Sequence, residues 1–155
     1  MLRRAFLLLA TAMAGAAAAP AADPDIRGTW YPDTYILKDG TRHPVRGQII
    51  FTDREWNVVF LVAPDRRTPR RGSGEAGTYT LEGNRLVFSH LYNLSGGEAV
   101  KGIPAGPFEM NLHDTTDAPT EACTVERRGS RMTIRFPSGN AMEFAREAAD
   151  SVRTQ

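Results

Sequence analysis

Large apolar side chains alternate with polar ones in a series of short segments, and turn-forming residues separate these segments. In residues 85–92, for example, Leu86, Phe88, His90 and Tyr92 fall on one face of an extended chain. This period of two is typical of β-strands, and no segment shows convincing helical periodicity. The predicted strands are residues 28–37, 46–52, 56–63, 76–81, 85–92, 107–113, 120–126, 131–136 and 141–146.

Tight turns join most of these segments. Asp39-Gly40, Gly83-Asn84 and Ser138-Gly139 supply residues that accept the positive φ angles of hairpin turns. Nine short strands joined in this way predict an all-β domain, and successive hairpins favour a small antiparallel up-and-down β-barrel of about 8–9 strands over a sandwich. The sole cysteine, Cys123, cannot form an internal disulfide, so the core alone must hold the fold.

The N-terminus has the pattern of a secretory signal peptide. Arg3-Arg4 precede an apolar run, and small residues end it at Ala18. We therefore expect a signal peptide at 1–18, a disordered leader at 19–25, the barrel at 26–146 and a polar tail at 147–155. A buried N-terminal helix is the alternative for the first segment, and Arg3-Arg4 also partly match a twin-arginine export signal. Either export route predicts a periplasmic or secreted protein.

The charge balance narrows the class of partner. The whole chain carries a net charge of +1, and loss of Arg3 and Arg4 with the signal peptide leaves −1. A nearly neutral protein has no overall field for nucleic acid or an anionic membrane. No second apolar stretch is long enough to span a membrane.

The bulkier face of each strand is predicted to line the barrel interior. Trp30, at the start of the first strand, is expected to close the far end, because an indole buries a large apolar area. The other inward side chains form an apolar and aromatic cup for one small ligand. The predicted ligand-binding residues are Phe51, Trp56, Phe60, Phe88, His90, Tyr92, Phe108 and Met110.

Several segments resemble the bacterial lipocalin-like domain proteins. Gly28-Thr29-Trp30 matches the G-x-W signature of the calycin and lipocalin group, and the segments 47–52, 76–84 and 132–140 follow in the same order. The resemblance covers about residues 26–146. It implies a small antiparallel barrel with an internal cavity, and it carries no fixed catalytic residues.

Three hypotheses of function follow. The first is a binding protein for a small apolar or aromatic molecule, with His90 and Tyr92 orienting the ligand. The second is a cofactor-independent cyclase, isomerase or lyase, in which His90 is the acid or base and Tyr92 donates a proton, because imidazoles titrate near neutral pH. The third is a structural or interaction module with a filled barrel. The alternative for His90 and Tyr92 is a structural role, in which both side chains form hydrogen bonds to the neighbouring loop.

The remaining polar residues indicate no specific binding or catalytic site. Glu121 and Asp114 lie beside turns and are expected at the surface, although strand parity also allows them at the cavity rim. The facing of Tyr35 and Asp33 depends on whether Pro32 introduces a bulge. No spacing indicates a cofactor or a metal site, and Cys123 is expected to pack as a small apolar residue. The histidines of the chain are His43, His90 and His113. Residues 64–74 are predicted to form a basic loop, whose arginines are Arg66, Arg67, Arg70 and Arg71.

Overall fold

A computed structural model describes residues 24–147 of the chain; the segment predicted to be the signal peptide, most of the leader and most of the tail lie outside the described residues. No helix in this described part is long and apolar enough to cross a membrane. The strands are β1 Gly28–Ile36, β2 Arg42–Phe51, β3 Glu55–Val62, β4 Arg71–Glu82, β5 Arg85–Gly97, β6 Gly106–Leu112, β7 Thr120–Arg128, β8 Arg131–Arg135 and β9 Ala141–Ala145.

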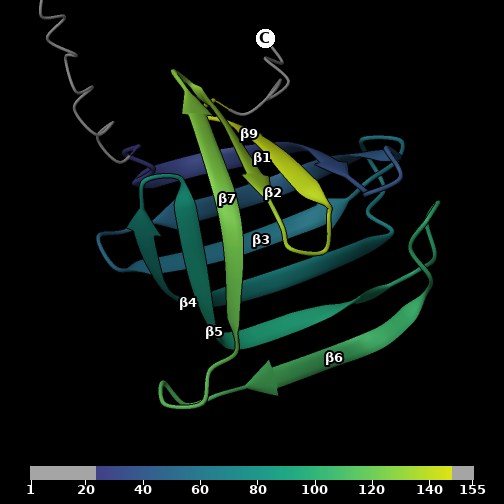
Figure 1. The fold of residues 1–155 in the computed structure, drawn as a ribbon. Helices are drawn as coiled ribbons and strands as arrows, with labels where there is room; N and C mark the ends of the chain where they lie inside the picture. Colours follow the sequence, from purple (N-terminus) through teal and green to yellow (C-terminus); the bar gives the residue numbers. More distant parts are fainter. Residues whose placement is uncertain (1–23, 148–155) are drawn as a thin grey trace, which may run out of the picture.

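The strands form a closed antiparallel barrel. The sheet runs in the order β4-β3-β2-β1-β9-β8-β7-β5-β6, and an additional β4–β5 pairing closes a ring of eight strands. Most neighbours in the ring are also neighbours in sequence, so the connections are short hairpins (Figure 1). The predicted all-β class and the small up-and-down barrel are therefore confirmed.

One predicted barrel strand lies outside the ring. The strand β6 pairs only with the second half of β5, whereas β7 pairs with the first half, at residues 85–89 (Figure 1). The prediction that β6 points Phe108 and Met110 into the interior is wrong, because these side chains are 67% and 70% exposed. Alternation shows that one face of a strand is apolar, but it does not show which side of the strand meets the core.

Three strands extend at least four residues beyond one of their predicted ends. The strand β4 begins at Arg71 instead of residue 76, and β5 continues to Gly97 instead of ending at residue 92. The strand β2 begins at Arg42 instead of residue 46. The added parts of β4 and β5 are rich in glycine, which has a low intrinsic preference for strands. Pairing between the two extensions overrides that preference.

The longest hairpin, β4–β5, bends sharply where its register shifts. Gly77 pairs with His90 and Ala76 pairs with Tyr92, so Leu91 is an extra residue in β5. A Cβ on Gly77 would lie only 1.7 Å from the Ser89 carbonyl oxygen, so the two backbones approach as only glycine allows. Bulges of this kind bend strands at barrel corners. In Figure 1 the two strands stand upright beside β7 and then turn to run along β3 and β6.

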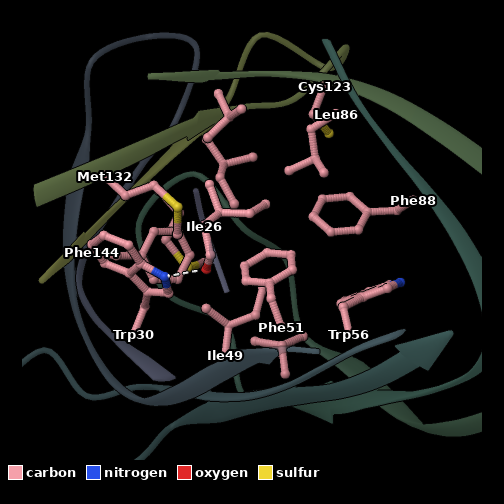
Figure 2. Packing of buried hydrophobic residues seen from close by; sticks show 14 residues of the cluster. Ile26, Trp30, Ile49, Phe51, Trp56, Leu86, Phe88, Cys123, Met132 and Phe144 are labelled. Carbon is pink, nitrogen blue, oxygen red and sulfur yellow. Dashed lines mark hydrogen bonds between the residues drawn. The ribbon is translucent and has the colours of Figure 1, made fainter. Parts of the chain in front are cut away.

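The core lies inside the barrel and is largely aromatic at its centre. Phe51 stacks on Phe88 with ring centroids 6.2 Å apart, and Trp56 contacts Phe88 at 4.3 Å. Figure 2 shows Trp30, Met132 and Phe144 gathered on one side of the cluster and Phe88 and Trp56 on the other. Cys123 is buried among these side chains, and burial raises the pKa of its thiol to about 12.

Trp30 lies at one end of this core and has no exposed surface. Its indole Nε1–H donates to the Ile26 carbonyl oxygen at 2.7 Å, as Figure 2 shows. The Arg146 guanidinium lies 3.9 Å from the ring centroid, where a cation is attracted to the π face. A Cβ on Gly28, whose φ is +94°, would come within 2.7 Å of the same guanidinium. The Gly28-Thr29-Trp30 motif thus leaves room for the arginine that covers the indole.

Candidate functional site

A cavity of about 180 Å³ lies inside the barrel, beside the aromatic cluster. Six aromatic side chains line it, and they come from strands on opposite sides of the ring as well as from the β8–β9 turn. Three ionisable side chains join them: His90 from β5, Glu75 from β4 and Glu121 from β7. The aromatic residues are Tyr35, Trp56, Phe60, Phe88, Phe136 and Phe144.

His90 is held between the two carboxylates. Its Nδ1 lies 2.9 Å from Glu75 Oε2, and Ser73 Oγ donates to the other carboxylate oxygen of Glu75 at 2.8 Å. Burial by itself would raise the pKa of Glu75, but the hydrogen bonds from His90 and Ser73 and the charge on His90 leave it below its ordinary value of 4.5. Glu75 is therefore an ionised acceptor at neutral pH, and the proton of a neutral His90 lies on Nδ1.

Glu121 faces the other ring nitrogen across a gap. Glu121 Oε2 lies 3.9 Å from His90 Nε2, which is beyond hydrogen-bond distance. Burial raises the pKa of Glu121, the negative charge of Glu75 raises it further, and His90 opposes the shift. A neutral His90 thus presents a lone pair on Nε2, and the Glu121 carboxyl group lies nearby without forming a hydrogen bond to it.

Tyr35 completes the polar part of the cavity lining. Asn140 Nδ2 donates to the Tyr35 hydroxyl at 2.8 Å, so the hydroxyl keeps its own hydrogen for another acceptor. Burial is the main cause of a raised Tyr35 pKa, and the negative charge of Glu121 adds to it. The phenol is therefore neutral at physiological pH and can donate.

The structure brings together half of the predicted ligand-binding residues. Trp56, Phe60, Phe88 and His90 line the cavity, and Trp56 meets the His90 ring edge-on at 5.2 Å. Phe51 packs within the core against Phe88, away from the cavity lining. The other three, Tyr92, Phe108 and Met110, lie outside the barrel and are 39%, 67% and 70% exposed.

The prediction put Tyr92 on the wrong face of β5 because it did not include the bulge at Leu91. Simple alternation puts Tyr92 on the same face as His90, but the extra residue shifts the register by one. Tyr92 pairs with Ala76, which neighbours the inward Glu75 and so points the opposite way. The prediction that Tyr92 faces the interior beside His90 is therefore wrong, and Tyr92 does not line the cavity.

Three polar lining residues were missed or left undecided by the sequence. Glu75 lies just before the predicted strand at residues 76–81 and was not a candidate, although Gly72-Ser73-Gly74-Glu75 alternates small and polar residues in a way compatible with a strand. Glu121 was expected at the surface and lines the cavity instead, while Asp114 is exposed. A register shift between Pro32 and Thr34 supplies the bulge that turns Tyr35 inward.

The remaining candidates have structural partners. His43 is buried, and its Nε2 lies 2.8 Å from the Lys101 carbonyl oxygen, which ties β2 to the loop after β5. In the basic loop, Arg70 pairs with Glu98 at 2.6 Å, and Arg66 lies 3.8 Å from Asp33. Within residues 24–147 no group of three or more His, Cys, Asp or Glu side chains is arranged to hold a metal ion.

Comparison of the chain with protein-family models, with curated proteins and with solved structures finds no match. The structure shows an eight-stranded antiparallel barrel with one additional strand, which is compatible with a lipocalin-like fold. Membership of the lipocalin group stays a prediction from the sequence motifs. Because one fold serves many functions, the residues of the cavity indicate the function.

The Glu75→Gln variant tests the electrostatics of the site. Because the folded protein lowers the pKa of Glu75, the carboxylate stabilises the fold above the ordinary value of 4.5, and this contribution is lost as the pH falls through the folded pKa. We expect the variant to be less stable than the wild type at neutral pH, with a difference that shrinks in acid. Urea unfolding over a pH series measures this difference.

The matched control for this measurement is Asp114→Asn, which removes an exposed carboxylate at a turn. Its unfolding free energy should stay close to that of the wild type across the series. A difference between wild type and Glu75→Gln that grows on acidification would contradict the assignment of Glu75 as an ionised acceptor.

Proposed function

We propose that this protein binds one small aromatic molecule inside the barrel, and that the ligand carries an amine or another hydrogen-donating group. The observation that supports this proposal is the composition of the cavity. Six aromatic rings surround it, and one side holds His90 with two carboxyl groups. Apolar pockets with a few convergent polar groups are typical of small-molecule sites.

The size of the cavity limits the ligand. A volume of about 180 Å³ is close to the roughly 150 Å³ of an engineered apolar cavity that takes up benzene. A single-ring molecule with a short substituent matches this space, whereas a fatty acid or a polycyclic pigment exceeds it. The ring would contact Trp56 and Phe88, which already pack against each other at 4.3 Å.

The polar side of the cavity favours a donor on the ligand. Nε2 of a neutral His90 and the carboxyl oxygens of Glu121 both accept hydrogen bonds and lie 3.9 Å apart, so one ammonium group can donate to both. A positive charge is also favoured by two nearby carboxylates and by the surrounding aromatic faces. An anionic ligand would meet these carboxylates without a compensating arginine or lysine in the lining.

Binding of benzylamine, benzyl alcohol and benzoate by calorimetry tests this proposal. We expect benzylamine to bind most tightly and benzoate not to bind. Glu121→Gln should weaken the binding of benzylamine about 10- to 100-fold, because a charge-assisted hydrogen bond contributes about 1.5–3 kcal/mol. The affinity for benzyl alcohol should change much less.

Two features of this experiment separate binding from folding. Since burial raises the pKa of Glu121, removal of its charge should not destabilise the fold at neutral pH, so weaker binding reports on the site. Asp114→Asn removes the same charge from an exposed turn and should leave both affinities unchanged. Equal affinity of the wild type for all three probes, or binding of none of them, would contradict the proposal.

The export predicted from residues 1–18 is part of the same proposal. A free, exported binding protein needs no membrane span, and the described residues contain no apolar helix of that length. N-terminal sequencing of the protein purified from its own source should find a mature chain that begins near residue 19.

A second candidate function is acid–base catalysis on a ligand of the same class. The Glu75–His90 hydrogen bond of 2.9 Å orients the imidazole and fixes its tautomer, as carboxylates do for catalytic histidines. Tyr35 and Glu121, rather than Tyr92, are then the groups able to donate a proton to the reacting molecule. A product that forms in a metabolite extract with the wild type, but not with His90→Gln, would favour this candidate.

A further inference from the structure

The strand β6 carries an apolar row on the outside of the barrel. Phe108, Met110 and Leu112 are 67%, 70% and 83% exposed. The register with β5 places Met110 beside Leu94 and Leu112 beside Tyr92, so the row extends onto the outer face of β5. Contiguous exposed apolar surface of this kind is typical of interaction sites.

The same strand has an open backbone edge. The His113 amide donates to the Leu91 carbonyl at 2.7 Å, toward β5. Alternation along the strand then directs the N–H and C=O groups of Asn111 toward β5 and those of Met110 and Leu112 away from it. Within residues 24–147 no strand pairs with that outer side, and β6 ends the sheet (Figure 1). Exposed edges are usually protected by charges, and β6 has only Glu109.

We propose that β6 pairs antiparallel with β6 of a second copy of this chain, around a two-fold axis at Met110. This contact continues the sheet from one barrel into the next. The open edges are identical, so a two-fold axis lets each copy supply the donors and acceptors that the other lacks. The contact is independent of what the cavity binds.

Charge and shape select the register. An axis at Glu109 would place two glutamates directly opposite each other, which is destabilising. An axis at Asn111 would place Phe108 opposite the partner's Asp114. An axis at Met110 places Phe108 opposite the partner's Leu112 and Glu109 opposite the partner's Asn111. The Asn111 Nδ2 group, which already donates to Asn93 at 2.8 Å, has a second hydrogen for the Glu109 carboxylate.

One strand pairing buries little area, so the dimer should depend on concentration within the range that sedimentation measures. We expect the full chain to sediment as a monomer when dilute and as a dimer when concentrated. Met110→Pro removes an outward N–H that β5 does not use, and should weaken the dimer at least about tenfold. Val59→Lys changes an exposed residue of the outer face on β3, which β4 and β5 separate from β6, and should leave the dimer unchanged.

Disulfide trapping tests the register. Met110→Cys places two thiols on opposite residues of an antiparallel pair, with Cα atoms about 5.5 Å apart, within disulfide range. Leu112→Cys separates them by about 13 Å along the strands, four residues at about 3.3 Å each. Only Met110→Cys should form a disulfide-linked dimer on mild oxidation, since Cys123 is buried.

Several outcomes would overturn the proposal. A chain that stays monomeric at every soluble concentration would do so, and so would trapping through Leu112→Cys but not Met110→Cys. A dimer lost in Val59→Lys and kept in Met110→Pro would show that the outer face, rather than the edge, makes the contact. Binding of a foreign peptide or of lipid vesicles by a monomer would assign the edge to a different partner.

Discussion

Trp30→Ala is expected to lower the free energy of unfolding by about 3–5 kcal/mol, the cost typical of removing a large aromatic side chain from a core. The indole has no exposed surface, and its Nε1–H is hydrogen-bonded to Ile26. Its loss would leave a cavity in the core and remove the ring that Arg146 covers at 3.9 Å. A domain of this size is stable by about 5–15 kcal/mol, so this loss is a substantial fraction of the total.

Urea unfolding followed by far-ultraviolet circular dichroism measures this loss. Trp30→Phe is the companion variant that keeps the protein measurable if the alanine variant does not fold. It retains an aromatic face for Arg146 but leaves the Ile26 carbonyl without its donor, at a cost of about 1–3 kcal/mol. If the alanine variant lost less stability than the phenylalanine variant, the predicted role of Trp30 in closing one end of the barrel would be wrong.

The alternation of residue types predicted the strands well because each strand of the ring has one face in the core. The ends of β1, β3, β7, β8 and β9 lie within about two residues of the predicted ones. On these strands the apolar face is also the inward face, as for Trp56 on β3 and Phe144 on β9. Tight turns with glycine and asparagine predicted the hairpins, and the succession of hairpins favoured the barrel that the β4–β5 pairing closes.

The site was predicted only in part, for two physical reasons. Side-chain facing reverses at a bulge, and a bulge depends on backbone contacts that one sequence segment does not specify. The Leu91 bulge turned Tyr92 outward, and the register shift after Pro32 turned Tyr35 inward. An apolar row also looks the same whether it faces the core or another molecule, which explains the error over Phe108 and Met110.

Gly77→Ala is expected to disturb both the fold and the site, because Gly77 is the point at which β4 and β5 bend. An alanine Cβ would lie 1.7 Å from Ser89 O and 3.1 Å from Leu91 N, and both atoms belong to the backbone. The strands can relieve this clash only by moving apart. We expect a loss of at least about 1–3 kcal/mol in the free energy of unfolding, the usual cost of overpacking.

The same displacement should reach the cavity through two neighbours of Gly77. His90 is the register partner of Gly77 on β5, and Trp56 is its partner on β3. Trp56 Nε1 also donates to Ser89 O at 3.4 Å, the atom that the new methyl group would displace. We therefore expect a changed near-ultraviolet circular dichroism signal from Trp56 and at least about tenfold weaker binding of benzylamine.

Gly106→Ala is the matched control, because a Cβ at Gly106 meets no atom within 4 Å. Its unfolding free energy should stay within about 0.5 kcal/mol of the wild type, and its affinity for the probe should not change. If both variants behaved like the wild type, β4 and β5 would not approach each other at Gly77, and the bend that turns His90 into the barrel would need another cause. Destabilisation by Gly77→Ala alone, with His90 and Trp56 both affected, would tie the position of the ligand-binding residues to this one glycine.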